Sequence, residues 1–159
     1  MKKSFLLTAI IFIYAMASAL CYGEYDAAAP LKIERVEFLS GKPKGYGRFQ
    51  LRDGDNFKKA EDVFIYIEVA NCVSERETRY YYTRLTMDVD IYYEDGLKIY
   101  SVEDTNFSDV QFNNKRHEGY IWTKIETSYL KEGEYKVEMT IRDENSDKEA
   151  FTLTTFRIL

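Results

Sequence analysis

Residues 79–94, RYYYTRLTMDVDIYYE, contain a long run of alternating side chains. From Leu85 to Ile91 every second residue is apolar, and the residues between them are polar or charged. Successive side chains of a strand point to opposite faces, so this alternation predicts a β-strand with one face on a hydrophobic core. The predicted core face comprises Tyr81, Leu85, Met87, Val89, Ile91 and Tyr93.

Further strands are predicted on both sides of this segment. Asp95 and Gly96 form a tight turn, after which residues 97–102 return as the second strand of a hairpin. Residues 62–71 are apolar on both parities, which is typical of a central strand. Residues 103–118 are interpreted as an irregular polar stretch and residues 41–60 as a long connection. The other predicted strands span 31–39 (with a bulge), 46–51, 119–130, 135–142 and 151–158.

The strand pattern predicts an all-β fold. About seven short strands separated by turn residues favour a single antiparallel β-sandwich over residues 31–159. The alternative is an eight-stranded lipocalin-like barrel, which the absence of a G-x-W sequence after the first strand disfavours. No stretch carries a helical apolar stripe across three turns.

Residues 130–135, LKEGEY, resemble the tyrosine corner of immunoglobulin-like and fibronectin type III domains, with Leu130, Gly133 and Tyr135 as its residues. The chain is also similar to exported bacterial proteins of unknown role. This resemblance implies an immunoglobulin-like Greek key and export, and it implies no activity. Trp122 precedes the corner instead of lying on a third strand, so the antibody-type disulfide core is not implied.

The N-terminus predicts a secretory signal peptide over residues 1–19. Lys2 and Lys3 precede an uncharged apolar stretch that ends in the small residues 17–19. The cut could fall as late as residue 23, and the residues up to 30 form a short linker. We therefore expect a periplasmic or secreted protein without stable membrane insertion after cleavage, although a retained membrane anchor is the alternative.

The cleavage site decides the state of the two cysteines. A cut after residue 19 leaves Cys21 and Cys72, which could form a disulfide in an oxidising compartment. A cut after residue 23 leaves Cys72 alone, and Cys72 is then interpreted as a small buried apolar residue. Both readings stay open on the sequence.

Removing residues 1–19 takes the net charge from −5 to −7, because they contain two lysines and no acidic residue. An acidic chain with dispersed Lys and Arg is not expected to bind nucleic acid. Lys42, Lys44 and Arg48 are interpreted as solvated loop charges.

No catalytic residue, cofactor or metal is predicted. His117 is the only histidine, so a nucleophilic dyad would need it beside Cys72, and too few His and Cys are present for a zinc site. Residues 53–56 and 143–147 are rich in oxygen ligands for calcium, yet Asp and Asn are also common in turns. Asp88 and Asp90 are interpreted as part of a polar strand face.

Aromatic side chains carry the predicted binding role. Tyr80, Tyr82 and Tyr92 share the parity opposite the core face, and Tyr120 and Trp122 share a parity opposite Ile121. The first hypothesis is a non-catalytic exported interaction module that binds an envelope or extracellular protein. Carbohydrate binding by these exposed aromatic residues is the alternative, and a secreted proteinase inhibitor or a small enzyme is the third hypothesis.

Overall fold

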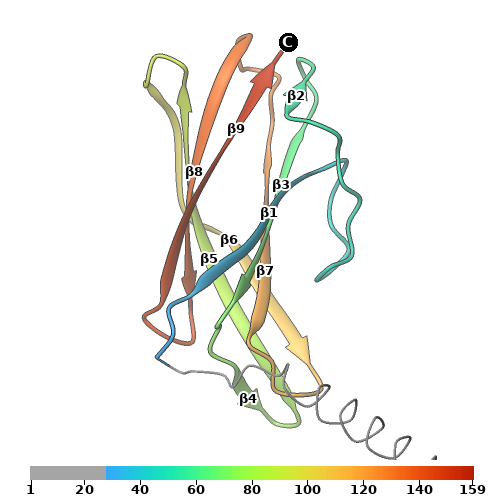
Figure 1. Cartoon of the computed structure of the whole chain (residues 1–159), viewed down its shortest axis with the longest axis vertical. Helices are drawn as coiled ribbons and strands as arrows, with labels where there is room; N and C mark the ends of the chain where they lie inside the picture. Colours follow the sequence, from blue (N-terminus) through green and yellow to red (C-terminus); the bar gives the residue numbers. More distant parts are fainter. Residues whose placement is uncertain (1–27) are drawn as a thin grey trace, which may run out of the picture.

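The computed structural model describes residues 28–159, except for the side chains of residues 104–107. The predicted signal peptide and Cys21 lie outside the described residues. Within them, nine strands form two sheets that pack face to face (Figure 1). In chain order the strands are β1 (Lys32–Leu39), β2 (Asn56–Phe57), β3 (Val63–Ala70), β4 (Glu75–Glu77), β5 (Tyr80–Tyr93), β6 (Lys98–Phe112), β7 (Glu118–Ile125), β8 (Gly133–Asp143) and β9 (Glu149–Ile158).

The smaller sheet has the order β1-β3-β7, and all its pairs are antiparallel. β3 lies in the centre, as its apolar residues on both parities predict. The predicted bulge in β1 is confirmed, since the register with β3 shifts between Ile33 and Arg35.

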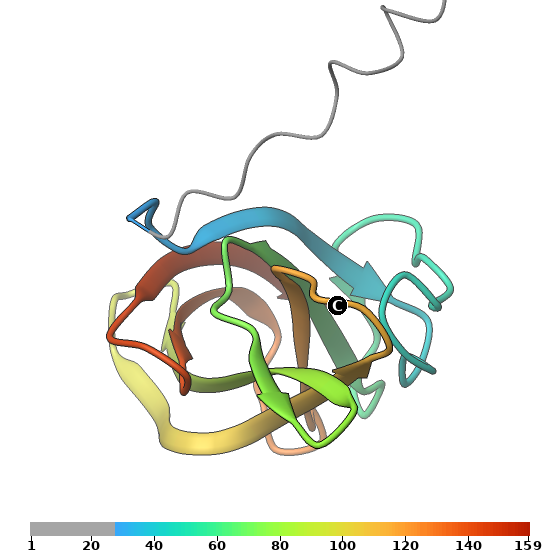
Figure 2. The same ribbon diagram turned by 90° about the horizontal axis from the view of Figure 1, so that it is seen from below.

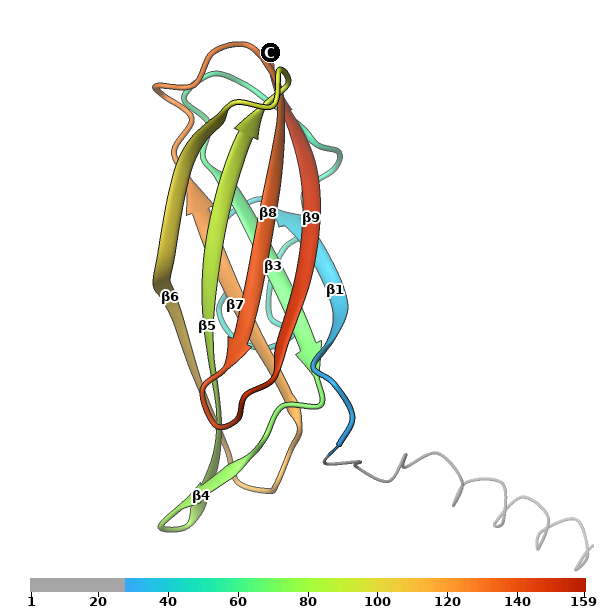
Figure 3. The ribbon, with the colours of Figure 1, turned by 90° about the vertical axis from the view of Figure 1, so that its left-hand side faces the viewer.

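The larger sheet places β9, β8, β5 and β6 side by side in front of the small sheet (Figure 3). β5 pairs with β8 on one side and with β6 on the other, and the predicted hairpin through Gly96 is confirmed. The two remaining strands are short: β4 pairs with the start of β5, and β2 runs parallel to the end of β9. No helix among the described residues is long and apolar enough to cross a bilayer.

Side chains from both sheets fill one core. β5 contributes Leu85, Met87, Val89 and Ile91, which are all buried, so the predicted core face is confirmed from Leu85 to Ile91. At the two ends of that face, Tyr93 packs against the core while partly exposed, and Tyr81 is partly exposed and lies outside the core. Opposite them lie the inward residues of β3 and β7, and the alternating apolar residues of β8 complete the core. Thr83 links the sheets, because its hydroxyl donates a hydrogen bond to the Glu118 carbonyl oxygen at 3.1 Å.

The tyrosine corner is confirmed by its hydrogen bond. The Tyr135 hydroxyl donates to the Lys131 carbonyl oxygen at 2.8 Å, and the Tyr135 ring stacks on Phe156 at 5.2 Å. Gly133 has φ +141°, and a Cβ at this position would lie 2.6 Å from the Tyr93 hydroxyl. Leu130 is buried beside this corner, so the three residues of the motif perform the expected structural roles.

If the strands are lettered as in immunoglobulin domains, β1, β3 and β7 correspond to A, B and E, and β5, β8 and β9 correspond to C, F and G. Strands A, B and E share one sheet and C, F and G share the other, as in that fold. The corner tyrosine also lies near the start of strand F. The described chain is therefore an immunoglobulin-like β-sandwich.

Three predicted segments were wrong. Residues 103–112 continue β6 instead of forming an irregular stretch, because β6 is an edge strand and tolerates polar residues on both faces. Residues 46–51 form no strand, since Gly45 and Gly47 have positive φ, and only Leu51 forms a bridge to Leu39. β7 ends at Ile125 instead of residue 130, where a turn replaces it.

Candidate functional site

The two predicted aromatic groups lie on different sheets. Tyr80, Tyr82 and Tyr92 belong to β5 in the large sheet, whereas Tyr120 and Trp122 belong to β7 in the small sheet. The structure therefore does not bring all five side chains together into one binding face.

The tyrosines of β5 are half-buried beneath cationic side chains. The Arg84 guanidinium lies 5.2 Å from the centre of the Tyr82 ring, and Arg79 lies 4.8 Å from that of Tyr80. Lys136 lies 4.6 Å from the Tyr92 ring centre. A ring that stacks on a sugar needs a free face, so these cations compete with such a ligand.

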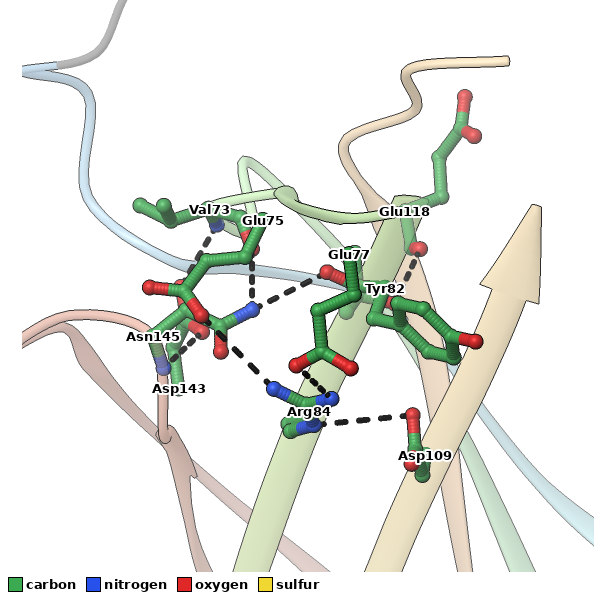
Figure 4. A network of polar contacts seen from close by, with 10 residues as sticks. Val73, Glu75, Glu77, Tyr82, Arg84, Asp109, Glu118, Asp143 and Asn145 are labelled. Atoms are coloured by element: carbon green, nitrogen blue, oxygen red, sulfur yellow. Dashed lines mark hydrogen bonds and ion pairs between the residues drawn. The ribbon is translucent and has the colours of Figure 1, made fainter. Parts of the chain in front are cut away.

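Arg84 is the centre of a charged cluster at the β4 end of the large sheet (Figure 4). Its guanidinium donates to Glu77 at 2.6 Å and lies 3.7 Å from Glu75 and 3.8 Å from Asp109. The hydrogen bond to Glu77 is the main cause that raises the pKa of Arg84. Its one cation faces three carboxylates, so the cluster stays acidic, and its ion pairs hold β4, β5 and β6 together.

Asp143 occupies the neighbouring part of the same network (Figure 4). Its buried carboxylate accepts hydrogen bonds from the Val73 N–H at 2.7 Å, the Asn145 N–H at 3.1 Å and the Ser146 hydroxyl at 2.9 Å. The Asn145 side chain donates to the Val73 and Tyr82 carbonyl oxygens. The Asp143 carboxylate oxygens thus stabilise the β8–β9 turn instead of facing a cation. The described residues contain no group of His, Cys, Asp and Glu side chains suited to a metal ion.

The other acidic pairs are also used within the fold. The Asp55 carboxylate accepts from Asn56 and its carbonyl oxygen accepts from the Arg157 N–H, which joins this turn to β9. Asp88 pairs with Arg142 at 2.5 Å. Asp90 accepts hydrogen bonds from Lys98 and Ser101, which lower the pKa of its carboxyl group. Asp88 and Asp90 thus form ion pairs across strands and show no acid–base arrangement.

Cys72 and His117 are neighbours, but not as a nucleophile and its base. The His117 Nδ1 lies 2.8 Å from the Cys72 carbonyl oxygen, which can only accept, so this nitrogen carries the proton. The Cys72 thiol is free and buried, and burial, followed by the charge of Asp143, raises its pKa to about 12. Such a thiol is not an activated nucleophile. The bridge to Cys21 stays a prediction.

An aromatic cluster covers the outer face of the small sheet. Tyr66 of β3 and Tyr120 of β7 stack at 5.5 Å, and the loop after β1 adds Phe49 at 4.5 Å from Tyr66 and Tyr46 at 6.3 Å from Tyr120. The loop lies beside the small sheet, away from the large sheet (Figure 2). Burial raises the pKa of Tyr46 and Tyr66, and the Tyr66 hydroxyl donates to Glu68 at 2.8 Å.

A more open surface lies between the sheets, where β6 and β7 are the edge strands on the same side. We call it the β6–β7 seam. The small sheet ends at β7, so apolar residues of β6 that point toward it are left partly uncovered. Two hollows of about 260 and 230 Å³ lie along the seam and share Tyr129. The exposed fractions along it are 62% for Leu97, 38% for Ile99, 44% for Tyr100 and 62% for Tyr129.

Sequence reasoning missed the seam. Alternation shows which side chains of a strand point toward the partner sheet, but it does not show where that partner sheet ends. The apolar residues Leu97 and Ile99 on either side of Lys98, together with Tyr129 in a polar turn, were the only available indication.

The sequence matches no protein-family model and no curated protein. Three solved structures illustrate the similarity in fold. A family 123 glycoside hydrolase from Clostridium perfringens has 12% identity and a TM-score of 0.43, with 82% of this chain and 27% of that chain covered. The CARDB domain of the PF1109 protein from Pyrococcus furiosus, a complex with di-metal ions, has 14% identity and a TM-score of 0.40 over 86% of this chain and 100% of that chain.

The third structure, an immunoglobulin-like protein from Pseudomonas aeruginosa, has 10% identity and a TM-score of 0.41 over 84% of this chain and 100% of its own. These values concern the sandwich architecture alone. The chain spans about a quarter of the glycoside hydrolase that it matches. The protein belongs, by strand order and corner, to the immunoglobulin-like β-sandwich class.

Proposed function

We propose that this protein is a non-catalytic, exported interaction module that binds a protein partner at the β6–β7 seam. The observation that carries the proposal is the exposed apolar surface of the seam, formed by Leu97, Ile99, Tyr100 and Tyr129 around two hollows. Grouped exposed apolar side chains of this kind mark interaction surfaces on soluble domains.

The strand edges suggest how such a partner binds. β6 pairs with β5 on one side only, and β7 pairs with β3 on one side only, so each strand offers unpaired backbone groups at the seam. An extended segment of another chain can add to such an edge through main-chain hydrogen bonds. Its alternate side chains would then enter the hollows beside Tyr129, which supplies specificity.

The chemistry of the described residues supports a binding role over catalysis. Asp88, Asp90 and Asp143 take part in ion pairs or turn hydrogen bonds, and the Cys72 thiol is held in its neutral form. Export is the other part of the proposal, and it rests on the predicted signal peptide.

Affinity capture from a native cell-envelope extract tests the partner, with the purified protein as bait. The seam variant carries Leu97→Ser and Tyr129→Ser. The matched control carries Phe151→Ser and Leu153→Ser, because these β9 residues are 57% and 53% exposed and lie away from the seam. A Tyr80, Tyr82 and Tyr92 triple alanine variant tests the tyrosine face predicted from the sequence.

We expect a stoichiometric protein that is captured by the wild type, the β9 control and the tyrosine variant, and lost with the seam variant. Loss with the tyrosine variant alone would place the interface on the outer face of the large sheet. Capture of no stoichiometric protein by the wild type would refute the proposed function. Detection of the mature chain in the periplasm or the medium tests export.

A further inference from the structure

A second surface, separate from the seam, lies on the loop that follows β1. The loop forms a hollow of about 350 Å³ that is lined by Lys42, Lys44 and Arg48, together with the polar residues Ser40 and Gln50. The same loop covers the aromatic cluster of the small sheet through Phe49.

The charge of the hollow is opposite to that of the protein. The chain has a net charge of −5, yet three cations and no carboxylate line this hollow. Several other cations of the described chain pair with acids, as Arg84 does with Glu77 and Arg142 does with Asp88. None of the three loop cations lies within 4.0 Å of a described carboxylate, so their charge is available to a ligand.

The loop is held in one conformation by hydrogen bonds. The Lys44 N–H donates to the Arg48 carbonyl oxygen at 2.8 Å, and the Arg48 N–H donates to the Gly45 carbonyl oxygen at 3.0 Å. The Gly47 N–H donates to the buried Tyr66 hydroxyl at 2.9 Å, and Gly47 has φ +62°, a backbone conformation that favours glycine. A loop that is already ordered loses little conformational entropy when it binds a ligand.

These features narrow the ligand class. A guanidinium fork and two ammonium groups match an oxyanion such as carboxylate or sulfate. A long polyanion would be repelled by the negative charge of the rest of the protein, so one acidic group on an otherwise neutral ligand fits better. The volume is sufficient for a ligand of sugar size, and Ser40 and Gln50 offer partners for hydroxyl groups.

We propose that this hollow binds an acidic sugar unit, with its carboxylate or sulfate facing Lys44 and Arg48. Lys42 also lines the hollow, and its ammonium group is 5.1 Å from the centre of the Trp122 ring. Trp122 is the only tryptophan of the chain, so its fluorescence reports on the surroundings of Lys42. This inference does not depend on the proposed seam partner.

The test is titration calorimetry with four probes, namely methyl glucuronide, galactose 6-sulfate, methyl glucoside and sodium sulfate, with Trp122 fluorescence as a second readout. We expect one or both acidic sugars to bind at least ten times more tightly than the neutral sugar and the free sulfate. The affinity should fall as ionic strength rises, because the attraction is between exposed charges.

The site variant is Lys44→Gln with Arg48→Gln, and the matched control is Lys59→Gln with Arg79→Gln, which removes the same two side-chain types elsewhere. All four residues are exposed, so folding should be preserved, which an unfolding curve checks. The site variant should weaken binding at least tenfold, while the control and the seam variant should not.

Three results would overturn the inference: no binding of either acidic sugar, equal or tighter binding of free sulfate, or unchanged affinity in the site variant. Because the seam variant keeps this hollow, failure here and failure of the seam proposal are distinguishable.

Discussion

The tyrosine corner allows a prediction of defined size. Tyr135→Phe removes one hydroxyl group and keeps the ring that stacks on Phe156 and meets the Tyr93 ring edge-on at 5.3 Å. The loss is therefore one hydrogen bond, from the Tyr135 hydroxyl to the Lys131 carbonyl oxygen. One such bond contributes about 1 kcal/mol to the free energy of unfolding. For a domain of this size, the melting temperature should fall by roughly 4 °C.

Urea unfolding followed by Trp122 fluorescence measures the effect, with an unchanged slope showing that the unfolded state is the same. Tyr129→Phe is the control, since Tyr129 lies in the same connection and is 62% exposed, and it should change stability by less than about 0.5 kcal/mol. Tyr135→Ala, which also removes the ring, should cost about 4 kcal/mol. Equal stability of the Tyr135→Phe and Tyr129→Phe variants would refute the role given to this hydrogen bond.

Four further predictions concern other parts of the fold. Gly133→Ala should lower the free energy of unfolding by about 2 kcal/mol, because it combines a positive φ with overlap on the Tyr93 ring, and the same urea assay measures it. The Lys58 N–H and Arg52 lower the pKa of the Glu61 carboxyl group in the folded protein. The ionised Glu61 therefore contributes to the free energy of unfolding above the ordinary carboxyl pKa of about 4.3, and this contribution is lost as the pH falls below that value. Glu61→Gln should reduce the loss of stability between pH 6 and pH 3, which the urea assay at each pH measures. In the reduced protein, Cys72 should react with iodoacetamide at pH 8 only after urea is added, and reaction of the native protein would contradict its burial. Tyr66→Phe should increase amide hydrogen exchange at residues 44–48 at least tenfold without changing the exchange of β5, because it removes the acceptor of the Gly47 N–H.

The sequence predicted the elements whose pattern reflects a local rule. Alternation around Leu85–Ile91 identified β5 and its core face, and the Asp95–Gly96 turn identified the hairpin, because each depends on neighbouring residues alone. Residues 103–112 were misassigned because their polar composition has low strand propensity, and pairing with the long β5 outweighs that propensity.

The candidate sites depend on contacts between distant segments, which alternation does not contain. Tyr80 and Tyr120 share an outward orientation, but the sequence does not show that their strands belong to different sheets. Lys42, Lys44 and Arg48 were interpreted as solvated charges. The hydrogen bond that orders their loop joins Gly47 to Tyr66, which is 19 residues away, so local sequence did not reveal it. Burial of Tyr66 agrees with the prediction of a strand that is apolar on both faces, but the loop that covers its ring could not be foreseen.

In the loop after β1, main-chain groups hold the loop in place, whereas the side chains of Lys44 and Arg48 face the hollow. The hydrogen bonds that fix its turn are donated by the main-chain N–H groups of Lys44, Gly47 and Arg48, and their acceptors are two loop carbonyl oxygens and the Tyr66 hydroxyl. The side chains of Lys44 and Arg48 take no part in this attachment. Substitutions of Lys44 and Arg48 can therefore change ligand preference while the loop conformation is kept. This segment is suited to divergence in evolution, and to mutant libraries that select new ligands on an unchanged β-sandwich.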